Sequence, residues 1–178
     1  MDNIYTERLV IRKFNKGDGP GLYQYLSDPQ VVFYEPYEVF TPEEAAVEAE
    51  KRAENPAFYA VALKNGQLIG NLYLGQEAFN ACELGYVFNR NYWGHGYARE
   101  AAFAILEYAF NILGTHRVFS MCNPDNERSW RLMEGLGMRR EGCLIKNVYF
   151  KKDGNGEPVW QDTFIYAVLK NEWQDRRL

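Results

Sequence analysis

The chain has 178 residues and a formal net charge of −4, and 47% of its residues are hydrophobic and 16% aromatic. This length and composition suit one globular domain over residues 1–178 and argue against disorder. Its charges form no basic run, which argues against nucleic acid as a partner. No apolar stretch approaches a membrane span and no signal-peptide pattern is present, so we expect a cytoplasmic protein.

The cysteines and histidines are too few and too scattered to predict a metal site. Cys82, Cys122 and Cys143 form no Cys-x-x-Cys pair, and the histidines are His95 and His116 alone. We therefore expect reduced thiols and no bound metal.

The first half of the chain combines two helix patterns with three strand patterns. Thr41 precedes a proline and lies three residues before Glu44, which predicts a capped helix start. Asn65-Gly66 lies between two apolar runs, which predicts a tight hairpin turn. The expected elements are a strand at 6–14, helices at 18–27 and 42–54, and strands at 58–63 and 68–74.

The second half contains a long amphipathic helix pattern that begins after a glycine-bearing turn. We expect a strand at 82–89, that helix, a strand at 117–122, a helix at 126–136, and strands at 143–150 and 163–169. In this order antiparallel strands come first and one β-α-β crossover follows. It predicts an α+β (mixed α/β) fold with a central, mostly antiparallel twisted sheet and helices on both faces.

The glycine turn is the most informative local pattern. Gly94 and Gly96 flank His95, and the helix pattern starts at Tyr97. Free N–H groups at a helix N-terminus bind phosphate with the help of the helix dipole. A dinucleotide fingerprint is excluded because Arg99 stands where a small residue is needed, and no triphosphate loop is present. By itself a Gly-x-Gly is also compatible with an ordinary turn.

The run at 93–98 resembles the pyrophosphate-binding motif of the GNAT superfamily, the acetyl-CoA-dependent N-acetyltransferases. That motif reads Gln/Arg-x-x-Gly-x-Gly/Ala, and Trp93 occupies its first position here. The form Tyr-Trp-Gly-x-Gly-Tyr-Ala is similar to the subgroup related to the ribosomal-protein acetyltransferases RimJ and RimL. The segment 126–138 also resembles this subgroup, with Met138 in place of a Phe. So do residues 6–12 and, near the end, Asp162 and Glu172-Trp173.

The resemblance implies acetyl-CoA as co-substrate, bound along the strand, the turn and the second motif. The strand would splay from its neighbour, with a bulge at Gly85 and the N–H of Val87 polarising the thioester. An ordinary core strand is the alternative. Asn126 and Ser129 would contact the pantetheine and the thiol, although such residues also gather at helix N-caps. The implied cofactor-binding residues are Tyr86, Val87, Phe88, Trp93, Gly94, His95, Gly96, Tyr97, Ala98, Asn126 and Ser129.

Acetyl transfer needs a base for the amine and an acid for the departing thiolate. We expect Glu83, at the entry to the cofactor strand, to be the base, with Glu35 and Asp162 as alternatives. Many GNAT enzymes carry a Tyr acid at the place of Met133, which cannot donate a proton. Ser129 is therefore the predicted acid. Glu100, in the first turn of the long helix, is interpreted as a partner of the helix dipole.

The resemblance also implies an acceptor pocket near four residues after the first helix, Phe33, Tyr34, Glu35 and Tyr37. Core packing is the alternative for each of them. The implied reaction is direct attack by an amine in a ternary complex, with a protein N-terminal α-amine as acceptor and the enzyme a monomer or homodimer. A small amine such as a polyamine, an amino acid or an amino-sugar antibiotic is the alternative acceptor. A non-catalytic acyl-CoA-binding domain and an unrelated nucleotide-binding protein are alternatives of other classes.

Overall fold

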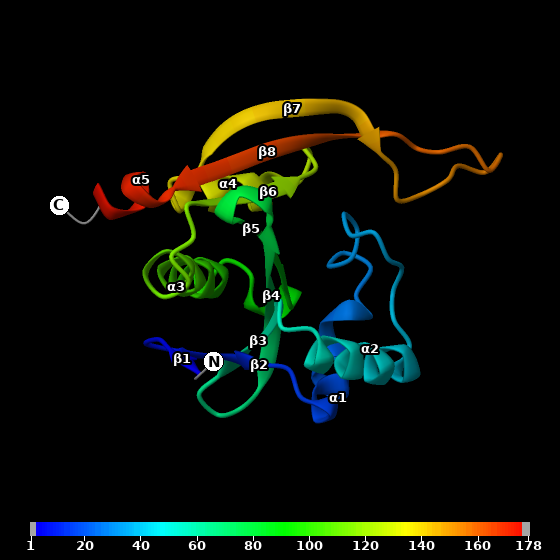
Figure 1. Cartoon of the computed structure of the whole chain (residues 1–178). Helices are drawn as coiled ribbons and strands as arrows, with labels where there is room; N and C mark the ends of the chain where they lie inside the picture. Colours follow the sequence, from blue (N-terminus) through cyan, green and yellow to red (C-terminus); the bar gives the residue numbers. More distant parts are fainter. Residues whose placement is uncertain (1–2, 176–178) are drawn as a thin grey trace.

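A computed structural model describes residues 3–175, which form one large sheet with helices on both faces (Figure 1). The strands are β1 (Ile4–Tyr5), β2 (Leu9–Lys13), β3 (Phe58–Leu63), β4 (Leu68–Glu77), β5 (Ala81–Phe88), β6 (Arg117–Cys122), β7 (Arg139–Val148) and β8 (Gln161–Leu169). The helices are α1 (Gly19–Leu26), α2 (Pro42–Glu54), α3 (Tyr97–Asn111), α4 (Glu127–Gly135) and α5 (Lys170–Asp175). None of the helices within residues 3–175 is long and apolar enough to cross a membrane.

The eight strands follow the order β1-β2-β3-β4-β5-β6-β8-β7. Within the described residues, β5 and β6 are the one parallel pair, and α3 makes the crossover between them. The β7–β8 hairpin extends beyond the rest of the sheet (Figure 1). This arrangement confirms the predicted α+β fold with a mostly antiparallel sheet.

Two hydrophobic cores lie on opposite faces of the sheet. The first packs α3 and α4 against β5 and contains Leu84, Ile105 and Phe110, all almost fully buried. The second packs α1 and α2 against the other face around Leu22 and Tyr25. In Figure 1, α3 lies on one side of β4 and β5, and α1 and α2 lie on the other. Burial of each such side chain stabilises the fold by about 1.5–3 kcal/mol, so both faces of the central strands are fixed.

Local sequence signals explain two of the connections. The Thr41 hydroxyl accepts the N–H of Glu44 at 3.2 Å, and the Glu44 carboxylate accepts the N–H of Thr41 at 2.8 Å, which confirms the capping box. In the β3–β4 hairpin Gly66 adopts a φ of 91°, a conformation that favours glycine. Its N–H donates to the carbonyl of Leu63, which closes the turn.

Some details differ from the sequence prediction. The strand predicted at 6–14 begins only at Leu9, because the Thr6 hydroxyl accepts the N–H of Leu9 in a turn, and the short strand β1 precedes that turn. The β7 strand begins at Arg139 instead of 143, and its register shifts between Leu144 and Val148. The bulge expected at Gly85 is absent, since the β4–β5 register is continuous from Gly70↔Phe88 to Glu77↔Ala81.

Candidate active site

A cleft opens where β5 and β6 diverge. The two strands pair through Ala81–Glu83 and Arg117–Phe119, and within residues 3–175 no other strand pairs with the rest of β5 on that side. A cavity of about 1190 Å³ occupies the gap. Its walls come from β5, β6, the turn before α3, the start of α4 and the connection between α1 and α2. The splayed strand is the feature that the resemblance implied.

The backbone of β5 directs alternate N–H groups into this cleft. The N–H of Asn89 donates to Ile69 on β4 at 2.9 Å, and Val87 lies in the same continuous register opposite Asn71. Because backbone groups alternate along an antiparallel pair, the N–H of Val87 also points toward β4. The N–H groups of Tyr86 and Phe88 therefore point into the cleft. The expectation that Val87 polarises the thioester does not fit this register.

The glycine turn ends in an uncapped helix N-terminus. Gly94 and Gly96 have φ of 78° and 79°, in the left-handed region that favours glycine. The first intrahelical bond of α3 runs from the N–H of Glu100 to Gly96, and no side chain of the described residues caps the helix. The preceding N–H groups are therefore available to an anion, and the dipole of the 15-residue helix favours negative charge there.

Three residues, Thr6, Arg8 and Glu100, form a hydrogen-bonded group that contacts the glycine turn. We call this group the N-terminal clamp. The Glu100 carboxylate accepts from the Thr6 hydroxyl at 2.6 Å, the Arg8 N–H at 2.9 Å and Arg8 Nε at 2.6 Å. Arg8 Nη1 donates to the carbonyl of His95 at 2.9 Å, and the Arg8 guanidinium lies 4.3 Å from the ring centroid of Tyr97. The segment before β2 thus fixes the backbone of the glycine turn.

The clamp also keeps Glu100 ionised. Burial by itself would raise the pKa of this carboxyl, but the hydrogen bonds from Thr6 and Arg8 outweigh it and lower the pKa below its ordinary value. The Glu100 carboxylate is turned toward Arg8 and does not cap α3. It therefore leaves the helix N-terminus to a ligand.

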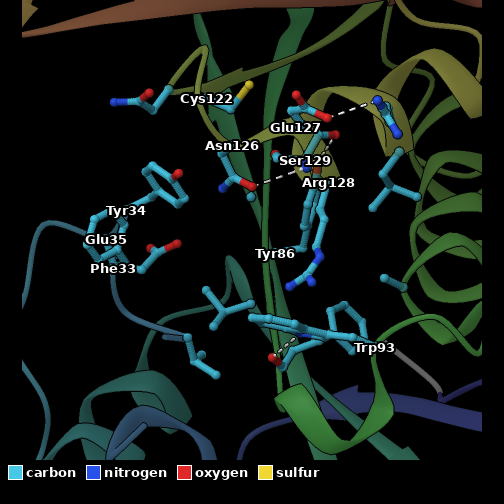
Figure 2. Close-up of a pocket in the computed structure, with 18 of the residues that line it drawn as sticks. Phe33, Tyr34, Glu35, Tyr86, Trp93, Cys122, Asn126, Glu127, Arg128 and Ser129 are labelled. Carbon is cyan, nitrogen blue, oxygen red and sulfur yellow. Dashed lines mark hydrogen bonds and ion pairs between the residues drawn. The ribbon is translucent and has the colours of Figure 1, made fainter. Parts of the chain in front are cut away.

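Basic side chains gather at the same end of the cleft. The guanidinium of Arg128 lies 4.5 Å from the ring centroid of Trp93, so it reaches from α4 across to the turn (Figure 2). Trp93 is held in place because its Nε1 donates to the carbonyl of Phe88 at 2.8 Å. Arg99 and Arg131 also line the cleft, and Arg131 forms an ion pair with Glu127 at 2.9 Å. Arg128 and Arg99 therefore supply positive charge near the turn, although Trp93 stands at the basic position of the motif.

The start of α4 brings Asn126 and Ser129 to the cleft. The side-chain oxygen of Asn126 accepts the N–H of Ser129 at 3.3 Å and caps the helix, so the N-cap interpretation is correct for this oxygen atom of Asn126. Both side chains also line the cavity. The Ser129 hydroxyl lies 2.9 Å from the hydroxyl of Tyr86, which reaches it from β5. Met133 is fully buried in the first core and does not reach the cleft.

The opposite wall comes from the connection between α1 and α2. Phe33, Tyr34 and Glu35 line the cleft there, and Figure 2 shows Glu35 facing Tyr86 and Ser129 across open space. The Tyr34 hydroxyl donates to the carbonyl of Asp125 at 3.1 Å and joins this wall to the segment before α4. Burial raises the pKa of Glu35 to about 7, against the opposing effect of a hydrogen bond from Tyr37.

Comparisons with known proteins agree with this geometry. The model of the Acetyltransferase (GNAT) domain matches residues 8–139. YnaD of Bacillus subtilis strain 168, an uncharacterized N-acetyltransferase, is 41% identical over 96% of this chain and 99% of its own. The crystal structure of a GNAT family acetyltransferase from Bacillus anthracis has 37% identity and a TM-score of 0.86, covering 96% of this chain and 100% of that one. The ribosomal protein uS5-alanine N-acetyltransferase of Escherichia coli is 27% identical over 98% of this chain and 94% of its own.

This chain belongs to the GNAT acetyltransferase family.

As a GNAT acetyltransferase it transfers the acetyl group of acetyl-CoA to an amine. No cluster of three or more metal-ligating side chains exists in residues 3–175. The cleft fits the co-substrate, because an open strand edge leads to a helix N-terminus surrounded by arginines. Such an edge offers N–H and C=O groups to an amide-bearing arm, and such a terminus holds phosphates.

Several residues that we assigned to this GNAT site lie outside the cleft lining. Glu83 precedes the divergence of β5 and β6 and does not line the cavity, although burial and the nearby Glu77 raise its pKa. Asp162 accepts the N–H of Lys146 at 2.8 Å instead of facing the cleft. The side chain of Tyr37 lies behind the wall, with its ring 5.3 Å from that of Phe40. Three carboxyls were candidates for the base: Glu83, Glu35 and Asp162. Of these three, the described geometry places only Glu35 in the cleft.

Within the turn, His95 does not line the cleft, and its carbonyl is held by Arg8. Arg8, which holds the glycine turn, and Arg128, which lies over Trp93, were not among the site residues predicted from the sequence of this GNAT enzyme. Both stand inside segments that resemble the family, residues 6–12 and 126–138, so the signal was present. Their partners lie 87 to 92 positions and 35 positions away along the chain, and only folding brings these pairs together.

Proposed function

We propose that this enzyme acetylates the α-amine of a protein or peptide N-terminus, as a member of the RimJ/RimL-like subgroup. The observation that carries the proposal is Glu35, a carboxyl on the acceptor wall of the cleft whose pKa is raised to about 7 by burial. Its acidity suits an α-ammonium, and the similarity to the uS5-alanine N-acetyltransferase supports the same class of acceptor. The resemblance of the glycine turn and of residues 126–138 to the subgroup supports it further.

The possible acceptor amines differ in acidity, and this difference favours the α-amine. An N-terminal α-ammonium has a pKa of about 8, and a lysine or polyamine ammonium about 10.4. Transfer of its proton to a carboxylate of pKa about 7 is unfavourable by about one pKa unit in the first case, or roughly tenfold. In the second case it is unfavourable by about three units, or roughly 10³-fold. A base such as Glu35 is therefore matched to an α-amine.

The remaining residues would hold the co-substrate and stabilise the reaction. The turn at Gly94–Ala98, with Arg128 and Trp93, would bind the pyrophosphate, and the open edge of β5 and Asn126 would bind the pantetheine arm. One of the cleft-facing N–H groups, of Tyr86 or Phe88, would stabilise the oxyanion that forms on the thioester carbonyl. Removal of one such donor typically costs about 10²-fold or more in rate.

Direct attack in a ternary complex is preferred over a covalent acyl-enzyme. Cys122 is the cysteine that lines the cleft, and burial raises the pKa of its thiol to about 11. A thiol with that pKa stays protonated at neutral pH and is a poor nucleophile. The acetyl group therefore passes from the thioester straight to the amine.

An acceptor screen that measures release of free CoA thiol tests the proposal. The matched pair is a peptide with a free α-amine and no lysine, and the same peptide with a blocked N-terminus and one lysine. Spermidine and an amino-sugar antibiotic form the other arms. We expect turnover with the free α-amine alone. Preference for spermidine or the amino sugar would assign the enzyme to small amines. Binding of acetyl-CoA without turnover on any amine would favour the non-catalytic alternative.

A further inference from the structure

A cluster of hydroxyl and thiol groups lies on the cleft wall formed by β5, β6 and α4. The Tyr86 hydroxyl lies 2.9 Å from Ser129 Oγ and 3.0 Å from the carbonyl oxygen of Ser129. Burial raises the pKa of the Cys122 thiol, and the influence of Ser129 lowers it in part. All three residues line the cleft, and Figure 2 shows Tyr86 and Ser129 on the wall opposite Glu35. A reacting group between these walls would have a base on one side and proton-bearing groups on the other.

The position where many GNAT enzymes carry a tyrosine acid has no proton donor in this chain. Met133 stands there, and it is fully buried in the first core and has no proton to donate. The β5 strand instead brings the phenol of Tyr86 to the same helix, one turn nearer its start. Tyr86 can reach Ser129 because its side chain lies on the same face of β5 as the buried Leu84 and Phe88.

We propose that Tyr86 and Ser129 form a proton relay to the departing sulfur of CoA. This inference rests on the proposed function of the cleft. Glu35 first takes the proton of the α-ammonium and releases it to solvent. The neutral amine then attacks the thioester carbon, the N–C bond forms, and Glu35, again a carboxylate, takes the second amine proton. The C–S bond then breaks and its electron pair goes to sulfur. Sulfur takes the proton of Ser129 Oγ, the serine takes the phenolic proton of Tyr86, and solvent returns the proton held by Glu35 to the phenolate.

The hydrogen-bond geometry allows this transfer. The Tyr86 hydroxyl donates to the carbonyl oxygen of Ser129 at 3.0 Å, and Ser129 Oγ lies 2.9 Å from the same hydroxyl. Rotation of the phenolic O–H from the carbonyl to Oγ therefore brings its proton to the serine oxygen, and the serine proton is then directed elsewhere. Burial raises the pKa of the Tyr86 hydroxyl above its ordinary value, so the group is protonated at neutral pH. Cys122 is the other neighbour of Ser129 and the alternative source of the proton, which the experiment must separate.

Four variants test the relay in the full chain: Tyr86→Phe, Ser129→Ala, their double variant, and Cys122→Ala. Tyr166→Phe is the matched control, since Tyr166 is buried in the first core and its hydroxyl donates to Glu134 at 2.9 Å, away from the cleft. Turnover is followed by thiol release with the best acceptor of the wild type. If no amine is accepted, the slow hydrolysis of acetyl-CoA is followed, because the thiolate must be protonated there too.

We expect Tyr86→Phe to lower kcat about 10-fold, with the Kd of acetyl-CoA within twofold of wild type. This lies below the usual 10²–10⁴ for proton transfer because a thiol of pKa about 8.5 leaves readily. The double variant should be no slower than Ser129→Ala, since the two groups act in series. Replacement of Tyr86 by a fluorotyrosine keeps the shape of the ring and lowers its pKa, and kcat should change with that pKa.

Other outcomes overturn the relay. If Tyr86→Phe turns over as fast as Tyr166→Phe, the phenol supplies no proton. If the effects of Tyr86→Phe and Ser129→Ala multiply, the two residues act independently. If Cys122→Ala alone reproduces the loss, the thiol feeds the serine. The proposed function is scored separately, by which acceptor the wild type uses, so failure of one proposal is distinct from failure of the other.

Discussion

The two ends of the cleft are built in different ways. At the cofactor end, the turn lies between the end of β5 and the 15-residue α3, and the N-terminal clamp fixes it through Arg8 and Glu100. At the acceptor end, the wall belongs to residues 27–41, which contain no helix or strand. Phe33 in this segment is 57% exposed. The segment is held by contacts such as the hydrogen bond from the Tyr34 hydroxyl to the carbonyl of Asp125.

This difference indicates which part of the site is fixed by the fold. A phosphate-binding turn works only if its N–H groups converge, so it needs a rigid support. An acceptor wall on a connecting segment can change its residues without disturbing the sheet. We therefore expect substitutions at the cofactor end to alter acetyl-CoA affinity, and substitutions at the acceptor end to alter turnover and acceptor choice.

The largest expected effect is at the acceptor end. Glu35→Gln should lower kcat/KM for the amine by about 10²-fold or more, because the cleft loses its base, while the KM for acetyl-CoA stays unchanged. The matched control is Glu83→Gln, which removes a carboxyl outside the cleft and should change kcat/KM by less than about threefold. Steady-state kinetics with both variants make the comparison.

The pH dependence sharpens this test. In the wild type, kcat/KM should rise as pH increases through about 7, where Glu35 loses its proton, and Glu35→Gln should remove that rise. A larger loss in Glu83→Gln than in Glu35→Gln would return the role of base to Glu83.

At the cofactor end, Gly96→Ala should raise the Kd of CoA about 10-fold or more. The left-handed backbone at Gly96 is strained by a Cβ, so the turn changes shape and its N–H groups no longer converge. Gly114→Ala is the matched control, since Gly114 has a φ of 70° and open space around it but lies outside the cleft.

Both glycine substitutions should cost about 1–2 kcal/mol of stability, because each forces a side chain into the left-handed region. Calorimetric titration with CoA and thermal unfolding separate the two effects. Equal Kd values for the two variants would contradict the assignment of the turn to phosphate.

A smaller effect is expected from the clamp. Arg8→Gln and Glu100→Gln should each weaken acetyl-CoA binding about fivefold without changing kcat, because they loosen the turn and touch no reacting atom. The double variant should be little worse than either, since both break one network. Glu141→Gln breaks the ion pair with Arg117 on the sheet, outside the cleft, and should leave Kd unchanged. Additive losses in the double variant would show that Arg8 and Glu100 act separately.

The smallest effect concerns stability and again involves Glu35. Its folded pKa of about 7 lies above the ordinary value of 4.5, so the folded state holds more protons between these values and stability falls as pH rises through this window. Glu35→Gln should therefore match wild type at pH 4, below both pKa values, and be more stable at pH 8, by about 1–2 kcal/mol after allowance for partial solvation. Equal stability at both pH values would show that Glu35 is solvated.

Much of the fold could be predicted because it depends on local patterns. The helix that begins after Thr41 has its cap, proline and Glu44 within four residues, and β3 was predicted with its observed bounds. The errors occur where distant contacts decide. The late start of β2 depends on the Thr6 turn beside Glu100, 94 positions away. The early start of β7 depends on pairing with β8, as at Arg139↔Ala167.

The candidate site could be predicted in part for the same reason. The glycine turn lies in a short segment with a recognisable pattern, and so do Asn126 and Ser129. These residues were predicted to contact the cofactor, and the structure places them in the lining of the cleft. The choice of Glu83 rested on its place along β5, but the divergence from β6 begins only after Glu83. The choice of Val87 ignored which side of β5 pairs with β4, which depends on the register.

The sequence by itself determined the family, the order of the elements and the phosphate-binding turn, because these depend on residue types at short fixed spacings. The tertiary structure alone decided which carboxyl faces the cleft, which N–H groups of β5 are exposed, and that Tyr86 meets Ser129 across 43 positions. Those features depend on strand register and on where two strands part. Both are set by packing between segments far apart in the chain.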